Sequence, residues 1–234
     1  MNHLRYSRII DLSHEITLTI PRWPGDPPVE LETVATIPHD GYYLQKVSLG
    51  EHSATHMNAP KSFHQDGVGI EAYSAESRVV PAVVIDVRTQ SAADPDYVLT
   101  TGDILAWEAR YGQIPAGSVV IMYTGWQEKW QTPAAFLNQD ESGGFHFPGF
   151  GKETTRFLLN HRHIAGVGID THGVDPGQET SYLTNTQVLA QQGIVLECLT
   201  HLDQLPPTGT TLVLGILRLR DGSGSPVSVM AFIP

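Results

Sequence analysis

Two apolar runs restrict the fold of this chain more than any other feature. Residues 79–87 form a mostly unbroken apolar run, and residues 118–123 form a second one. Such a run is typical of a strand covered on both faces, because neither face can then meet water. Residues 104–111 have an amphipathic helical pattern, and residues 152–161 also read as a helix. Alternating strands and helices of this kind predict an α/β chain.

The length and composition of the chain favour one soluble domain over residues 1–234. The apolar fraction of 41% is too high for a disordered chain, and no repeat, linker or low-complexity segment divides the sequence. The net charge is -11 without any run of lysine or arginine, so nucleic acid is not an expected partner. The single cysteine, Cys198, excludes an internal disulfide.

No apolar run approaches the roughly 20 residues that a membrane-spanning helix needs. The N-terminal residues 1–7 also lack the apolar core of a signal peptide. We therefore expect a cytoplasmic protein that does not contact a membrane.

The stretch of residues 51–64 contains three histidines. His52, His56 and Asn58 have the same parity, so an extended strand would point all three side chains to one face. Ala54 between them is small enough to leave that approach open. Two imidazoles and an amide oxygen suit zinc, manganese or iron. The plain alternative is that two histidines four residues apart occur by chance.

This stretch resembles the signature of the cyclase family, which includes bacterial kynurenine formamidases and isatin hydrolases. The family signature reads His-x-Gly-Thr-His-x-Asp-x-Pro-x-His-Phe, and five positions match: His52, Thr55, His56, Pro60 and Phe63. Further similar pieces follow in the family's order, at residues 11–14, 23–27, 124–126, 168–171 and 202–205. The resemblance implies the swivelling β/β/α cyclase-like fold, with a mixed sheet and flanking helices.

The departures from the signature concern the metal. Ala54 replaces its glycine, Asn58 replaces the aspartate that can bridge two metals, and Ser62 replaces the last histidine, which helps in catalysis. Another family histidine, which binds the second metal, corresponds to Asn185 or Thr186. An asparagine oxygen cannot bridge two cations well. The resemblance with these changes implies one divalent metal, zinc or manganese, rather than two.

Glu197 is the expected distant ligand. It lies in a predicted strand over residues 194–198, where alternation separates Val195 and Glu197 from the other members. A carboxylate in an apolar strand is costly unless it is paired or bound to metal, and family members carry a ligand glutamate there. The alternative is a salt-bridged sheet residue. Cys198 points to the opposite side and is interpreted as core, not as a nucleophile.

The remaining site residues follow from position and resemblance. His64 keeps the parity of Ser62 and could take over the missing histidine's catalytic role together with Glu197, or it is an ordinary loop histidine. His172 and His201 are reserve candidates. Trp23 lies on a proline-rich loop that relatives use near the substrate, and it joins Ser62 and Phe63 as an expected substrate-binding residue.

Two classes of function remain open. The first is a metal-dependent hydrolase, in which metal-activated water opens a small cyclic or aryl amide such as a formamide, a lactam or an isatin-like ring. The second is a family member that has lost the reaction and binds a small molecule or a protein. The resemblance also implies a homodimer or homotetramer.

Overall fold

The computed structural model describes residues 4–234. Its strands are β1 (Arg8–Asp11), β2 (Glu30–Ala35), β3 (Leu44–Ser48), β4 (His56–Asn58), β5 (Val79–Asp86), β6 (Val98–Leu99), β7 (Val119–Tyr123), β8 (Gly149–Phe150), β9 (Gly166–Ile169), β10 (Ile194–Glu197), β11 (Thr210–Ile216) and β12 (Gly224–Ile233). Its α-helices are α1 (Ile37–Asp40), α2 (Arg88–Ala93), α3 (Thr101–Tyr111), α4 (Pro133–Leu137), α5 (Lys152–Phe157) and α6 (Leu183–Leu189). Within this described part, no helix is both long and apolar enough to cross a membrane.

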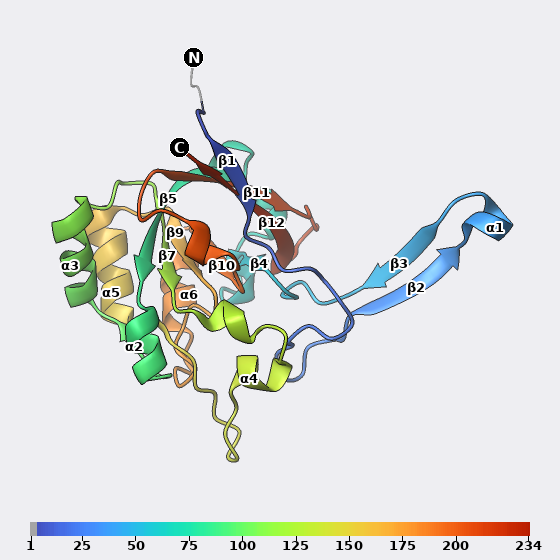
Figure 1. Cartoon of the computed structure of the whole chain (residues 1–234), viewed down its shortest axis with the longest axis horizontal. Helices are drawn as coiled ribbons and strands as arrows, with labels where there is room; N and C mark the ends of the chain where they lie inside the picture. The colour runs from blue at the N-terminus through green and yellow to red at the C-terminus, as the bar shows by residue number, and fades with distance from the viewer. Residues whose placement is uncertain (1–3) are drawn as a thin grey trace.

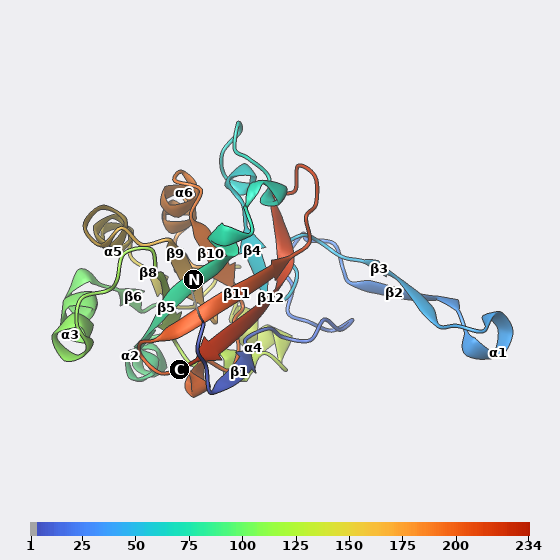
Figure 2. The same cartoon turned by 90° about the horizontal axis from the view of Figure 1, so that it is seen from above.

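A mixed sheet forms the centre of the molecule. Its strand order is β1-β12-β11-β5-β7-β9-β10-β4, and β4 also pairs with β12, so seven of these strands close into a ring (Figure 2). The strands β5, β7, β9 and β10 run parallel, whereas β4, β11 and β12 join by antiparallel pairing. The predicted α/β class and mixed sheet are confirmed, and the closure through β4 is a feature that the sequence did not predict.

Two apolar clusters explain why the runs at residues 79–87 and 118–123 are continuous. One fills the inside of the closed sheet, with Met57 and Leu196 among its members. The other, which includes Val195, lies between the outer face of the parallel strands and the helices α3, α5 and α6 (Figure 1). Burial of both faces removes the need for polar alternation.

The predicted helices are present with adjusted ends. The first begins at Thr101 because Thr100 and Asp103 form a reciprocal capping box, which satisfies backbone N–H groups before the helix starts. The second is α5, which continues into a π-helical turn over Leu158–Arg162.

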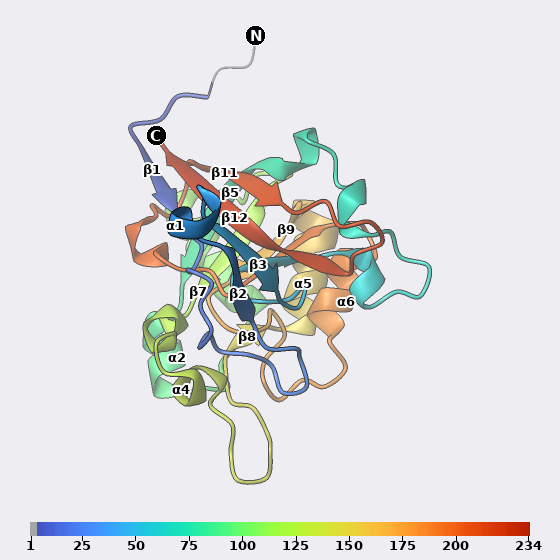
Figure 3. The same ribbon diagram turned by 90° about the vertical axis from the view of Figure 1, so that its right-hand side faces the viewer.

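The strands β2 and β3 pair only with each other and form an arm that projects from the body, with α1 at its tip (Figures 1 and 3). Almost every residue of the two strands is exposed. These two strands therefore do not belong to the central sheet.

Candidate active site

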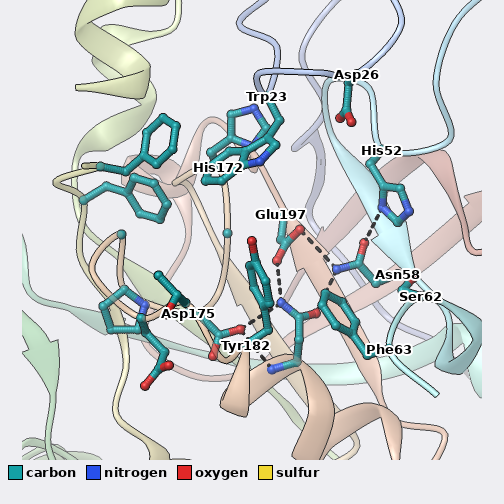
Figure 4. A pocket seen from close by; sticks show the side chains of 18 of the residues that line it. Trp23, Asp26, His52, Asn58, Ser62, Phe63, His172, Asp175, Tyr182 and Glu197 are labelled. Carbon is teal, nitrogen blue, oxygen red and sulfur yellow. Dashed lines mark hydrogen bonds between the residues drawn. The ribbon is translucent and has the colours of Figure 1, made fainter. Parts of the chain in front are cut away.

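A cavity of about 600 Å³ lies beside β4 and β10 (Figure 4). The residues that the sequence assigned to metal and substrate meet there: Trp23, His52, His56, Asn58, Ser62, Phe63 and Glu197. The other walls come from loops that follow α4 and β9, including Phe145, Phe147 and Gly173. A cavity of this size fits a small molecule.

The path of the histidine stretch differs from the expected one. The strand β4 begins only at His56, residues 51 and 52 form a turn, and Ala54 has a left-handed φ of 54°. The prediction of one extended strand from His52 to Asn58 is therefore wrong. The side chains converge nevertheless, because the turn folds His52 back to within hydrogen-bond distance of Asn58.

Strand pairing brings the distant glutamate to this point. In the antiparallel pair of β4 and β10, Glu197 lies directly opposite His56, and Val195 lies opposite Asn58. Directly opposed residues of an antiparallel pair project to the same face. Leu196 and Met57 therefore fill the inside of the sheet while His56 and Glu197 meet at the cavity.

His56 is oriented by its own backbone. Its Nδ1 lies 2.8 Å from the Ala54 carbonyl oxygen, which can only accept, so Nδ1 carries the ring proton. In the neutral ring Nε2 then has a lone pair, and it lies 2.9 Å from Glu197 Oε2. This contact requires a positive charge between the two atoms, which either a second ring proton on His56 or a bound cation supplies.

His52 contacts two oxygens. Its Nδ1 lies 2.8 Å from Asn58 Oδ1, and its Nε2 lies 2.9 Å from Ser223 Oγ. Burial and the neighbouring His56 lower the pKa of His52, which favours a neutral ring. A neutral ring carries one proton, so the position of that proton decides whether Nδ1 can act as a ligand.

Glu197 is buried and accepts from several donors. Its Oε1 accepts from the Val174 N–H at 2.9 Å and from Asn185 Nδ2 at 3.2 Å, and its Oε2 accepts from Asn58 Nδ2 at 3.1 Å. Burial alone would raise the pKa of this carboxyl, but His56 and the N–H donors outweigh it and lower the pKa to about 2. Glu197 is therefore a carboxylate.

The residues present fit one divalent cation. Between residues 4 and 234, no three or more His, Cys, Asp and Glu side chains form a ready ligand cluster. The Asn58 amide oxygen completes the set of His52, His56 and Glu197. Imidazole nitrogens with oxygen ligands suit zinc or manganese, and such an ion could replace the proton as the positive charge between His56 Nε2 and Glu197 Oε2.

Asn185 is the residue that reaches the position next to Asn58. Its Oδ1 accepts from Asn58 Nδ2 at 2.9 Å, and its Nδ2 donates to Asp175 Oδ2 at 3.0 Å as well as to Glu197. Burial raises the pKa of Asp175 to about 6, opposed by donors that include the Thr184 N–H. Neutral amide groups thus bring N–H donors to the two carboxylates.

An aromatic wall faces these polar groups across the cavity. The Trp23 ring stacks on Phe145 with 4.2 Å between centroids and contacts Phe147 and His172 edge-on. On the opposite side, Phe63 packs against Tyr182. The sequence did not predict that Phe145 and Phe147 would be the aromatic partners of Trp23.

Of the three other candidate histidines, His172 lines the cavity, whereas His201 and His64 do not. His172 lines the cavity, burial lowers its pKa to about 4, and its buried Nε2 has no hydrogen-bond partner among the described residues. His201 lies away from the cavity lining and bonds the Asp11 carbonyl oxygen through Nδ1. His64 also lies outside the lining, with Nε2 3.0 Å from the Thr186 carbonyl oxygen. The structure does not bring His64 to the site where a catalytic role was predicted.

Cys198 is fully buried and follows directly after β10, with a φ of 56°. Burial raises the pKa of its thiol. This environment suits an inert core residue and agrees with the expectation that Cys198 is not a nucleophile.

Comparison with known proteins identifies the family. The model of the family described as putative cyclase matches residues 10–176. The chain belongs to the cyclase family. This confirms the resemblance expected from the histidine stretch and from the shorter pieces along the chain.

Relatives extend the likeness over the whole fold. An isatin hydrolase of Roseibium aggregatum is 35% identical over 219 residues, which cover 89% of this chain and 82% of that protein. The structure of isatin hydrolase A from Ralstonia solanacearum matches with a TM-score of 0.91 at 33% identity, over 97% of this chain and 92% of that one. An isatin hydrolase bound to the product analogue thioisatinate matches with a TM-score of 0.90 at 33% identity and the same coverage. These likenesses confirm the expectation of an enzyme, a hydrolase.

Proposed function

We propose that this protein hydrolyses the cyclic amide of isatin or of a similar aryl lactam and that it uses one divalent cation, zinc or manganese. The observation that supports this most is the convergence of His52, His56, Asn58 and Glu197, whose ring nitrogens face oxygen atoms at 2.8 and 2.9 Å. The isatin hydrolases among its relatives support the type of substrate.

His52, His56, Asn58 and Glu197 would hold the cation. A cation bound there would polarise a substrate carbonyl and lower the pKa of water towards about 7. In the overall reaction, the oxygen of water bonds to the amide carbonyl carbon, the carbon–nitrogen bond breaks, and the nitrogen takes up a proton. The products are an amine and a carboxylate on one molecule, with one proton released.

The remaining residues orient the substrate and move protons. The Trp23 indole, stacked on Phe145, offers a flat apolar face to an aryl ring, and Phe63 bounds the other side of the cavity. Glu197 is the carboxylate closest to the histidine pair and is our candidate proton carrier.

The amide groups of Asn58 and Asn185 favour this reaction over two-metal formamidase chemistry. Both donate N–H groups to Glu197, and Asn185 donates to Asp175 as well. An N–H donor and a metal ion cannot use the same carboxylate lone pair. A single cation on the histidine side is compatible with these contacts.

Metal content per chain tests the proposal directly. We would measure it on untagged protein and on the His52→Ala/His56→Ala variant, with His201→Ala as a control histidine outside the cavity. We expect about one metal ion per chain in the wild type and in the control, and none in the double variant, with isatin hydrolysis lost alongside. Two ions per chain would contradict the single-metal site. No metal after soaking in zinc and manganese would favour the alternative, a family member that binds a small molecule or protein without catalysis.

We also propose that the arm of β2, α1 and β3 joins two copies of the chain, in a homodimer or a tetramer built from such dimers. Its exposed apolar side chains cannot be buried by the chain that carries them: Leu31, Val34, Ile37, Tyr42, Tyr43, Leu44 and Val47. Each copy also has a groove at the base of the arm, lined by Leu18, Pro27, Pro28 and Leu137. A second copy supplies both surfaces, so a two-fold arrangement buries both arms.

The mass of the protein in solution tests the arm. Val34→Lys/Tyr43→Lys places two charges on it and is expected to reduce the mass to that of one chain, whereas Leu105→Lys on the exposed face of α3 should leave the mass unchanged. A wild-type protein that sediments as a single chain at micromolar concentration would contradict the role of the arm.

A further inference from the structure

The loop before β12 contacts His52 through one side chain. Ser223 Oγ lies 2.9 Å from His52 Nε2, on the side of the ring opposite to the Nδ1 atom that faces Asn58. Gly224 follows, and a Cβ atom there would lie 2.7 Å from His52 Cε1. Only glycine at this position lets the ring approach the loop so closely.

The Ser223 hydroxyl donates its proton to Glu51. Glu51 Oε2 lies 2.5 Å from Ser223 Oγ and also accepts from the Ser223 backbone N–H at 2.9 Å. A carboxylate only accepts, so Ser223 must donate its hydroxyl proton to Glu51. The lone pairs of Ser223 Oγ are then left to accept, and the atom within reach is His52 Nε2.

This direction of donation determines the ring proton of His52. Nε2 has to carry the proton in order to donate to Ser223. Nδ1 of the neutral ring is left with its lone pair towards Asn58 Oδ1 at 2.8 Å, a contact of two acceptors that a cation bound to both would stabilise. With the reverse tautomer, Nε2 and Ser223 Oγ would face each other as two acceptors, because the hydroxyl proton is held by Glu51. A hydrogen bond to one ring nitrogen commonly sets which nitrogen binds a metal.

Ser62 connects this arrangement with the altered signature. Its hydroxyl donates to the Ser223 carbonyl oxygen at 2.5 Å, and the Ala59 N–H donates to the same oxygen at 2.8 Å. Ser223 is thus held through its hydroxyl, its N–H and its carbonyl oxygen. The serine that replaces the last signature histidine stabilises the loop that orients the first one.

We infer that Glu51 and Ser223 are positioning residues: they hold His52 in the Nε2–H tautomer and thereby offer Nδ1 to the divalent cation. This inference rests on the proposed function for the cation itself. The tautomer of His52, in contrast, can be observed in the metal-free protein.

The test combines cation affinity with the ring tautomer. We would measure Mn²⁺ and Zn²⁺ affinity by titration against a competing chelator, and the His52 tautomer by ¹⁵N NMR of the metal-free protein, with the signal assigned from His52→Ala. Ser223→Ala should weaken cation binding by about 10–100-fold, the usual effect of losing such an outer partner, and should shift His52 away from the Nε2–H form. Ser223→Thr keeps the hydroxyl and should restore both readouts.

Glu71→Gln is the matched control, because Glu71 accepts from the Asp221 N–H of the same loop without touching Ser223 or His52. Equal losses of affinity in Glu71→Gln and Ser223→Ala would show that loop order alone matters, and would overturn the inference. An unchanged tautomer or unchanged cation affinity in Ser223→Ala would also overturn it. A wild type that binds no cation would instead overturn the proposed function, and the NMR result would still decide whether Ser223 orients the ring.

Discussion

Two histidines, His52 and His56, form one part of the surroundings of Glu197, the histidine side. Asn58 and Asn185, with Asp175 behind them, form the other part, the asparagine side. The histidine side presents ring nitrogens that face oxygen atoms at 2.8 and 2.9 Å, so a cation bound between these atoms would be stabilised. The asparagine side presents N–H groups that already occupy the carboxylates. Two neighbouring regions built around one carboxylate therefore differ in their capacity for a cation, which is why we propose one metal ion rather than two.

Replacing the two asparagines by residues that bind metals should change the number of metal ions per chain, and this is the largest effect that we predict. Asn58→Asp/Asn185→His replaces N–H donors with a carboxylate and an imidazole, which are metal ligands. We expect the count to rise from about one to about two metal ions per chain. Asn160→Asp on the protein surface is the control. A count that stays at one would mean that the surrounding backbone, and not these two side chains, limits the site.

The Glu197→Gln variant tests how much the hydrogen bonds to the shared carboxylate stabilise the fold. A glutamine side chain has one oxygen and an added N–H₂ group, so it cannot accept from Asn58, Asn185 and the Val174 N–H together. Unsatisfied buried donors should lower the free energy of unfolding by about 2–4 kcal/mol. Urea unfolding with chelator present measures this without a metal contribution, and Glu153→Gln on α5 is the exposed control. An unchanged midpoint would show that the N–H groups find other acceptors.

The smallest predicted effect is on the pH dependence of stability, through His14, which lies outside the cavity lining. His14 stacks on Trp130 at 3.9 Å between centroids, and burial followed by the nearby His201 lowers the pKa of His14 to about 4. The unfolded chain therefore binds a proton between pH 6.5 and 4 that the folded chain does not, and stability falls as the pH decreases through that range. We expect His14→Phe to reduce the loss between pH 7 and pH 5 by about 1–2 kcal/mol.

Urea unfolding at the two pH values measures this difference, with His39→Phe on the arm as a control for the loss of a histidine. If His14→Phe and the wild type lose equal stability on acidification, the protons responsible bind elsewhere. His172, which lines the cavity together with Glu197, would then be the first residue to test, because its pKa is also lowered to about 4.

Local patterns in the sequence anticipated much of this protein. The apolar runs and amphipathic segments predicted buried strands with helices between them, because a continuous run is stable only where both faces are covered. The alternation around Glu197 placed Val195 and Glu197 on one face, as the two apolar clusters bear out. The signature residues identified the family and the replacement of the signature aspartate by Asn58.

What the sequence could not supply depends on contacts between distant residues. The left-handed Ala54 turns the chain so that His52 reaches Asn58 by a route that parity does not describe. The choice between Asn185 and Thr186 depends on which side of α6 faces β10. His64 shares the parity of Ser62 but bonds to the Thr186 carbonyl instead of entering the cavity.

The sequence by itself therefore determined which chemical groups are available: two histidines, a glutamate in an apolar strand, and an asparagine at the position of the signature aspartate. The tertiary structure alone decided how their protons are arranged. A lone pair becomes a ligand only when every neighbouring donor and acceptor is placed. Glu51 directly precedes His52, but Ser223 lies 171 residues away along the chain. Hydrogen-bond direction is a property of the folded arrangement, so residue identity could not fix it.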